Sequence, residues 1–184
     1  GDTVVLVGSA VGDMRGMAPV RRSGAKPGDV VAVHGRLGCA AAGLAQLRHG
    51  HDIGDCVTAQ VQPQPDYATA RTAAAAATSM IDTSDGLIVD AGHIARSSSV
   101  DIDITRADIP VAGCLRAAAN ELHVDVWQWV LAGGEDHAFL ATFSAESSVP
   151  TGFTIIGQVT AGDGTVTVDG QAWEHPGGFE HFVR

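Results

Sequence analysis

The chain has 184 residues, of which 21 are acidic and 11 are basic, so its formal net charge is −10 at pH 7. This charge argues against a nucleic-acid-binding surface, because binding to phosphate backbones depends on Lys and Arg. Hydrophobic residues make up 45% of the chain, which is typical of a globular protein. The sequence contains no apolar run of about 18 residues, so it predicts no membrane span.

The first half of the chain alternates apolar strands with helices. Residues 3–7 (TVVLV) and 30–33 (VVAV) are β-branched and apolar, which is typical of buried strands. A basic stretch, residues 21–29, ends in a turn signal between them. Residues 39–48 favour a helix that follows the glycine-punctuated loop 34–38. Strand, glycine loop and helix together can present backbone N–H groups to an anion, although an ordinary connection has the same pattern.

The middle of the chain contains its most distinctive turn. Residues 49–66 are polar and contain proline, which predicts a loop, and the Ala-rich residues 68–78 predict a helix. Met80-Ile81 is interpreted as a short strand that leads into residues 82–86 (DTSDG). A second helix is expected to begin near Ser84.

Strands dominate the predicted C-terminal half. Residues 100–104 (VDIDI) alternate with period two, which indicates a half-exposed strand. Residues 110–122 predict a helix, and residues 138–143, 153–159 and 165–168 predict further strands. Alternation of strands and helices points to an α/β or α+β layered fold.

The three cysteines, Cys39, Cys56 and Cys114, are far apart in the sequence. Their number and spacing suggest neither a disulfide framework nor a zinc-binding motif. Isolated reduced thiols are typical of a cytoplasmic protein, and Cys39 and Cys114 are expected to be small core residues. The chain begins without Met and without a signal peptide, so we expect it to be a trimmed or excerpted chain.

The turn at residues 82–86 is the best candidate for chemistry. Asp82 and Asp85 are three residues apart at a strand–helix junction, where both carboxylates can converge on one point. Mg²⁺ prefers oxygen ligands of this kind and shares them with substrate phosphates. Ser84 can add a hydroxyl, and Gly86 permits the close approach of a ligand. The alternative is that Ser84 or Asp85 only caps the helix while Asp82 lies in a solvated loop.

Three other features carry weaker signals. In residues 133–136 (GGED), paired glycines permit unusual backbone angles beside two acids, although an acidic turn explains the same letters. Arg22 can contact phosphate oxygens through its forked guanidinium, or it can belong to a solvated basic face. Asp2, as a single acid before a strand, is by itself a common loop residue.

The order of these motifs is more specific than any one of them. The chain resembles thiamine-monophosphate kinases over essentially its whole length, and it resembles aminoimidazole ribonucleotide synthetases and selenophosphate synthetases less closely. The resemblance rests on GDT (1–3), RRSGAKPGD (21–29), HGRLGCAAAGL (34–44), PQPDYA (63–68), IDTSDGLIVDAGHIARSSSV (81–100), LAGGEDHAFLATF (131–143), IIGQV (155–159) and GGFEHF (177–182).

The resemblance implies a two-domain protein. Residues 27–184 would form a three-layer α/β/α carboxy-terminal domain of the aminoimidazole ribonucleotide synthetase-like type. Residues 1–26 would be the end of an amino-terminal ATP-binding and dimerisation domain, with ATP bound between the domains of a homodimer. The family's amino-terminal acidic motifs, which hold further Mg²⁺, are absent from this sequence, so we expect the chain alone to be a poor catalyst.

The resemblance also implies an activity. The family transfers the γ-phosphoryl group of ATP directly to thiamine monophosphate, which gives thiamine diphosphate without a protein nucleophile. Such transfer depends on positioning and on charge neutralisation by Mg²⁺, which explains how an acidic protein can bind two anionic substrates. No nucleic-acid or membrane partner is expected. The matching motifs assign Asp2, Asp82 and Asp85 to Mg²⁺, Ser84 and Arg22 to the nucleotide phosphates, and Glu135 and Phe179 to the thiamine moiety.

The sequence departs from the family pattern at a few positions. Cys39-Ala40 stands where the family usually has Asp-Ser, His137 replaces a common Tyr, and Ser99 replaces a common Gly. None of these changes removes an expected Mg²⁺ ligand. Two alternatives stay open: a sibling ATP-dependent enzyme with another substrate, such as an amide-containing ribonucleotide, and a non-catalytic nucleotide-binding or dimerisation module.

Overall fold

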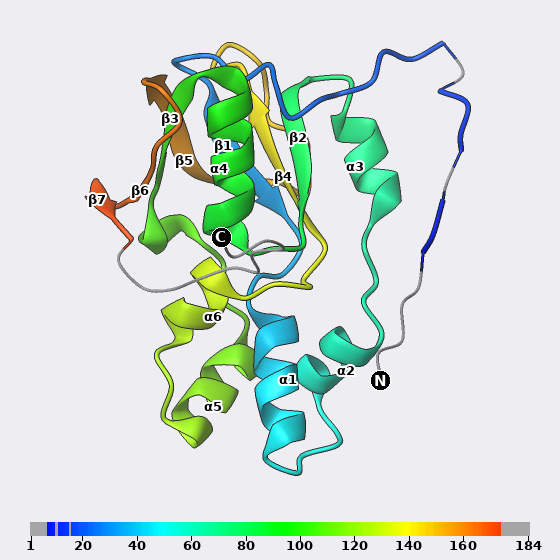
Figure 1. Ribbon diagram of the computed structural model, residues 1–184, viewed down its shortest axis with the longest axis vertical. Helices are drawn as coiled ribbons and strands as arrows, with labels where there is room; N and C mark the ends of the chain where they lie inside the picture. The colour runs from blue at the N-terminus through cyan, green and yellow to red at the C-terminus, as the bar shows by residue number, and fades with distance from the viewer. Residues whose placement is uncertain (1–6, 10, 15, 174–184) are drawn as a thin grey trace.

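The computed structural model describes residues 7–9, 11–14 and 16–173. Its centre is a seven-stranded sheet with the order β2-β4-β1-β5-β3-β6-β7 (Figure 1). The β3–β6 pair is parallel and the other pairs are antiparallel, so the sheet is mixed. The strands are β1 (Val30–His34), β2 (Ala77–Thr83), β3 (Val100–Ile104), β4 (Ala138–Phe143), β5 (Thr154–Ala161), β6 (Val166–Val168) and β7 (Gln171–Ala172).

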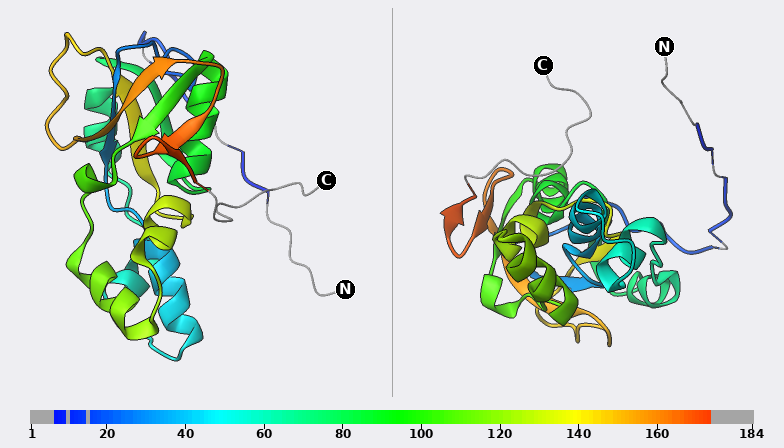
Figure 2. Two further views of the ribbon diagram at one scale, coloured as in Figure 1. Left: turned by 90° about the vertical axis from the view of Figure 1, so that its left-hand side faces the viewer. Right: turned by 90° about the horizontal axis from the view of Figure 1, so that it is seen from below.

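The helices lie in three places around this sheet. Helix α4 runs along one face, α3 stands beside β2 and β4, and four helices gather at one end of the sheet (Figures 1 and 2). The members of that end cluster are α1, α2, α5 and α6. The helices are α1 (Cys39–Arg48), α2 (Asp55–Val61), α3 (Tyr67–Ala73), α4 (Leu87–Ser98), α5 (Gly113–Leu122) and α6 (Val126–Ala132), with a 3-10 helix η1 (Arg106–Asp108).

Both faces of the sheet bury apolar side chains. The larger core lies between the sheet and α4, where Leu87 and Ile94 pack with strand residues such as Ile102 and Leu140. A smaller core lies on the other face, where Phe143 packs with Ala32, Ala141 and Ala73, the last of which belongs to α3. The period-two pattern of β3 explains its place, because Val100, Ile102 and Ile104 are buried while the aspartates between them are half-buried.

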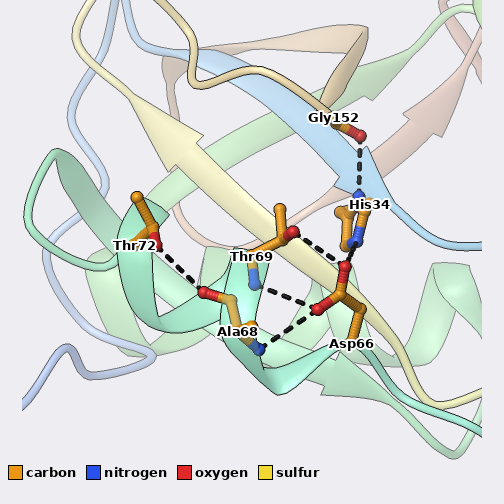
Figure 3. A network of polar contacts seen from close by, with 6 residues as sticks. All are labelled: His34, Asp66, Ala68, Thr69, Thr72 and Gly152. Carbon is orange, nitrogen blue, oxygen red and sulfur yellow. Dashed lines mark hydrogen bonds and ion pairs between the residues drawn. The ribbon is translucent and has the colours of Figure 1, made fainter.

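A polar network ties the end of β1 to α3 and to the loop before β5 (Figure 3). Nδ1 of His34 lies 2.7 Å from the carbonyl oxygen of Gly152, and Nε2 lies 3.2 Å from a carboxylate oxygen of Asp66. Asp66 caps α3 by accepting the backbone N–H groups of Ala68 and Thr69, both at 3.1 Å. Hydrogen bonds from Thr69, followed by the contact with His34, lower the pKa of Asp66 to about 2.

Most predicted elements are present, and the differences have local causes. The loop predicted over 49–66 is wrong in part because it contains α2. The helix predicted over 68–78 is wrong at its end, since β2 begins at Ala77. The helix expected near Ser84 begins at Leu87. The strand predicted over 3–7 lies outside the described residues except for Val7, which is not in a strand.

Helix α6 was not anticipated: it fills the apolar run before Gly133. Within the described ranges, no helix has the length and apolar character needed to span a membrane.

Candidate active site

Two loops meet where β2 ends and β4 begins, and we call this place the acidic loop junction (residues 82–86 and 133–137). Because β2 pairs with β4 up to the partners Thr83 and Ala138, the loop after one strand lies beside the loop before the other. The backbone N–H of Glu135 donates to the carbonyl of Ser84 at 2.8 Å, and that of His137 donates to Thr83 at 3.0 Å. Backbone pairing therefore brings the two motifs of the sequence into one site.

The GGED segment packs closely against the loop 82–86 and has unusual backbone angles. A Cβ atom at Gly134 would lie 2.6 Å from the carbonyl oxygen of Ser84, so only glycine fits there. Glu135 and His137 both adopt positive φ angles, of 66° and 50°, which is costly for residues with a Cβ atom. This path places His137 between two acids, with Nδ1 3.8 Å from Asp82 and Nε2 3.6 Å from Glu135.

The buried carboxylate of Asp90 stabilises the turn at residues 82–86 through backbone hydrogen bonds. Asp90, in the first turn of α4, accepts the backbone N–H groups of Asp85 at 3.0 Å and Gly86 at 3.1 Å. Burial raises the pKa of Asp90 to about 6. The two hydrogen bonds oppose this rise, and the negative charges of Asp85 and Asp82 add to it. Three carboxylates therefore interact electrostatically at the end of β2.

A histidine completes a group of possible metal ligands. One ligand atom each from Asp85, Asp90 and His93 lies within 4.8 Å of the other two. Burial lowers the pKa of His93, and the positive charges of Arg96 and Arg22 lower it further. Since the charge of Arg22 acts on His93, the basic segment lies next to the acidic one.

The basic segment is held in place by its backbone. The carbonyl of Arg21 accepts the N–H of Met80 at 3.0 Å, and the carbonyl of Arg22 accepts the hydroxyl of Ser98 at 3.3 Å. Residues 21–22 therefore run between β2 and the end of α4, and both side chains are exposed to solvent. The exposed side chain of Arg22 therefore lies near the acidic segment.

The glycine loop before α1 binds an anion, and that anion belongs to the chain itself. The carboxylate of Asp136 accepts the N–H groups of Gly38 at 2.5 Å and Ala40 at 2.9 Å, at the N-terminus of α1. Burial raises the pKa of Asp136 to about 6 despite these hydrogen bonds. The loop therefore anchors the GGED segment, and Cys39-Ala40 contributes backbone rather than polar side chains to this contact.

Two hollows adjoin the junction. Asp82 and His137 line an open groove of about 1240 Å³ that runs along β2 past Arg21. Cys39, Asp136 and His137 line a smaller cavity of about 250 Å³ beside the start of α1. The groove has room for a ligand with several groups, because ligand sites commonly measure several hundred Å³.

The structure brings together most of the residues that the sequence singled out. Asp82, Ser84, Asp85 and Glu135 lie in the acidic loop junction. Arg22 is close enough for its charge to act on His93. Asp2 and Phe179, predicted for Mg²⁺ and for the thiamine ring, lie outside the described residues.

Sequence reasoning missed two residues that position the site. Asp90 and Asp136 were given no role of their own, although each contacts the backbone of a recognised motif. The position of Asp90 offered a signal, since an acid in the first turn of a helix can accept the N–H groups that the helix leaves unpaired.

Comparison with known proteins agrees with this geometry. No protein-family model matches the chain. The chain is 46% identical over 177 residues to thiamine-monophosphate kinase of Mycobacterium tuberculosis, a match that covers 95% of this chain and 53% of the relative. The corresponding protein of Corynebacterium glutamicum is 41% identical over 179 residues, covering 92% of this chain and 54% of the relative. The chain is a homologue of the thiamine-monophosphate kinases.

Solved structures support the same relationship. AaThiL complexed with AMPPCP and TMP matches with a TM-score of 0.81 and 33% identity, covering 89% of this chain and 54% of that one. Hydrogenase maturation protein HypE matches with a TM-score of 0.58 and 16% identity, covering 82% of this chain and 52% of that one, which shows the fold alone. The predicted resemblance and the aminoimidazole ribonucleotide synthetase-like α/β fold are confirmed. The chain spans about half the length of the thiamine-monophosphate kinases that it matches.

Proposed function

We propose that this chain serves in the ATP- and Mg²⁺-dependent phosphorylation of thiamine monophosphate to thiamine diphosphate. The observation that carries the proposal is the acidic loop junction, where two motifs about 50 residues apart meet through backbone hydrogen bonds. We further propose that residues 1–26 end an amino-terminal ATP-binding and dimerisation domain and that residues 27–184 form the carboxy-terminal domain. The complete protein would then be a cytoplasmic homodimer with ATP between its domains.

The residues at the junction suit Mg²⁺. Asp82 and Asp85 offer the hard oxygen ligands that this ion prefers. Burial, and to a smaller extent their charges, raise the pKa of Asp90, so a divalent cation beside them would relieve repulsion between these carboxylates. Bound Mg²⁺ would neutralise negative charge on the transferring phosphoryl group. Asp2 is proposed as a further ligand.

The chain's own residues would position the reactants for direct in-line transfer. Asp90 fixes the backbone of Asp85 and Gly86, which is the point of the chain from which the carboxylate of Asp85 projects. Ser84 and Arg22 would bind the nucleotide phosphates. No side chain needs to form a covalent intermediate, since phosphoryl transfer depends mainly on positioning and electrostatic stabilisation.

The thiamine end of the substrate would lie at the other loop. Glu135 is held at positive φ beside His137, and its carboxylate is proposed to contact the thiamine moiety. The aromatic ring of Phe179 is proposed to stack on the thiamine ring.

The test is the formation of thiamine diphosphate from thiamine monophosphate, ATP and Mg²⁺. The chain would be joined to its natural upstream sequence and compared as wild type, Asp82→Asn and Asp52→Asn. Asp52 is an exposed acid between α1 and α2, far from the acidic loop junction in sequence. We expect Asp82→Asn to reduce turnover by about 100-fold or more, and Asp52→Asn to leave it unchanged.

The outcomes separate the alternatives. An Asp82→Asn variant that folds and turns over at the wild-type rate would refute the role of Asp82. Wild-type protein that binds ATP but transfers its phosphoryl group only to another acceptor would indicate a sibling enzyme. ATP binding without turnover of any acceptor would indicate a nucleotide-binding module.

A further inference from the structure

The three cysteines form one group in the helical end of the molecule, which we call the thiol cluster (Cys39, Cys56 and Cys114). They belong to three different helices: Cys39 begins α1, Cys56 lies in α2 and Cys114 lies in α5. Their sulfur atoms all lie within 4.8 Å of one another. The prediction of isolated thiols is therefore wrong, because helix packing brings together residues that are distant in sequence.

A glycine makes this packing possible. A Cβ atom at Gly43 of α1 would lie 2.0 Å from the carbonyl oxygen of Cys56, so α2 can approach α1 this closely only because position 43 has no side chain. Helix α1 also packs against α5. Cys39 and Cys56 are buried and Cys114 is half-buried, so the cluster faces the interior while one member reaches toward the surface.

The surroundings of Cys39 suit a negatively charged ligand. Cys39 is the first residue of α1, and the dipole at the N-terminus of a helix favours a thiolate there. Arg36 lies close enough for its positive charge to act on Cys39.

We propose that Cys39, Cys56 and Cys114 bind Zn²⁺ where α1, α2 and α5 meet. Zn–S bonds of about 2.3 Å place the sulfur atoms about 3.8 Å apart in a tetrahedral site, so the cluster needs only a small contraction. Cys39 lines the cavity of about 250 Å³, through which the ion can enter and water can supply the fourth ligand.

The geometry favours a metal ion over a disulfide bond. A disulfide would join two of the sulfur atoms and leave the third unpaired, whereas an ion uses all three. Three thiolates and Zn²⁺ carry one net negative charge, and Arg36 is near enough for its positive charge to act on Cys39. Ligand chemistry separates this site from the acidic loop junction, since soft thiolates select Zn²⁺ and carboxylates select Mg²⁺.

The experiment is a titration of the full chain with Co²⁺ after reduction and removal of metals. Co²⁺ replaces Zn²⁺ in such sites and gives a thiolate-to-cobalt charge-transfer band in the near ultraviolet. We expect the band to saturate at one equivalent and to disappear when Zn²⁺ is added. A hundredfold excess of Zn²⁺ over its dissociation constant should raise the melting temperature of the chain by roughly 5–10 °C.

Two variants make the assignment specific. Cys114→Ser changes the half-buried member, which disturbs the packed core less than a change at either buried cysteine, and should weaken Co²⁺ binding at least about tenfold. His49→Ala removes an exposed imidazole at the end of α1 and should leave the band unchanged.

Each contrary result overturns the proposal. A folded wild-type chain with three free thiols but no charge-transfer band would show that the cysteines serve only as core residues. A band that persists unchanged in folded Cys114→Ser would exclude the three-cysteine site. A Cys39–Cys56 disulfide that forms on mild oxidation, in a chain that binds no metal when reduced, would identify a redox pair instead.

Discussion

The acidic loop junction and the thiol cluster assemble their residues in opposite ways. At the junction, neighbouring strands end side by side and backbone hydrogen bonds join the loops, so the carboxylates meet at a half-exposed surface. In the thiol cluster, three helices pack closely and bury their sulfur atoms. Sequence motifs predict the acidic loop junction, because the residues of each of its loops are contiguous in the chain. The thiol cluster becomes visible only in the packed structure, because its residues are far apart in the sequence.

The largest effect is expected from removing the glycine on which the thiol cluster depends. Gly43→Ala places a methyl group against the backbone of α2, so we expect a loss of about 2–3 kcal/mol in the free energy of unfolding despite the higher helix propensity of Ala. Gly113→Ala is the matched control, since a Cβ atom there meets no atom within 4 Å. Denaturant unfolding measures both, and equal stability of the two variants would contradict close packing at Gly43.

An intermediate effect is expected at the acidic loop junction and concerns pH. The folded state raises the pKa of Asp90 to about 6, above the value near 4 of an unfolded chain, so the folded protein binds more protons between these pH values. The contribution of Asp90 to the free energy of unfolding should therefore fall as pH rises from about 4 to about 6. Asp136 shifts in the same direction and adds to the decline.

Asp90→Asn tests this interpretation, because an amide oxygen can still accept the N–H groups of Asp85 and Gly86. We expect the variant, measured without divalent cations, to lose less stability between pH 4 and 6 than the wild type. Asp55→Asn, a change at an exposed acid of α2, should retain the wild-type profile. Superimposable profiles of Asp90→Asn and wild type would show that Asp90 does not titrate in this range.

The smallest effect is expected at the start of α6, which leads into the GGED segment. Asp125 caps this helix by accepting the N–H of Trp127 at 3.0 Å, so Asp125→Ala should cost about 1 kcal/mol. Gln128→Ala, at an exposed position of the same helix, should cost little. Thermal unfolding measures both, and a wild-type melting temperature in Asp125→Ala would mean that the cap is not needed.

Local patterns in the sequence predicted the regular elements well. The alternation VDIDI gave the position of β3, and β-branched runs gave β1. The helix predicted from the Ala-rich segment is too long, because strand pairing with β4 overrides the helix propensity of its last residues. β2 begins at Ala77, and the hydroxyl groups of Thr78 and Ser79 form hydrogen bonds with the hydroxyl of Thr142 in β4. Helix α2 escaped notice because it has seven residues, of which only Cys56 and Val57 are buried.

The candidate site was predictable to the extent that it lies in contiguous motifs. Asp82, Asp85 and Glu135 stand out as acids beside glycines, and the structure brings them together. The roles of Asp90 and Asp136 depend on which backbone N–H groups face them after folding, and no spacing rule in a single sequence specifies that.

The backbone hydrogen bonds between the two loops have a consequence for how such a site can evolve. The bonds from Glu135 to Ser84 and from His137 to Thr83 use only main-chain atoms, so they survive most replacements of the side chains that they carry. His137 faces Asp82 from this scaffold. Substitutions at these positions can therefore change the side chains that contact a substrate one at a time, while the main-chain hydrogen bonds that position the two loops are kept.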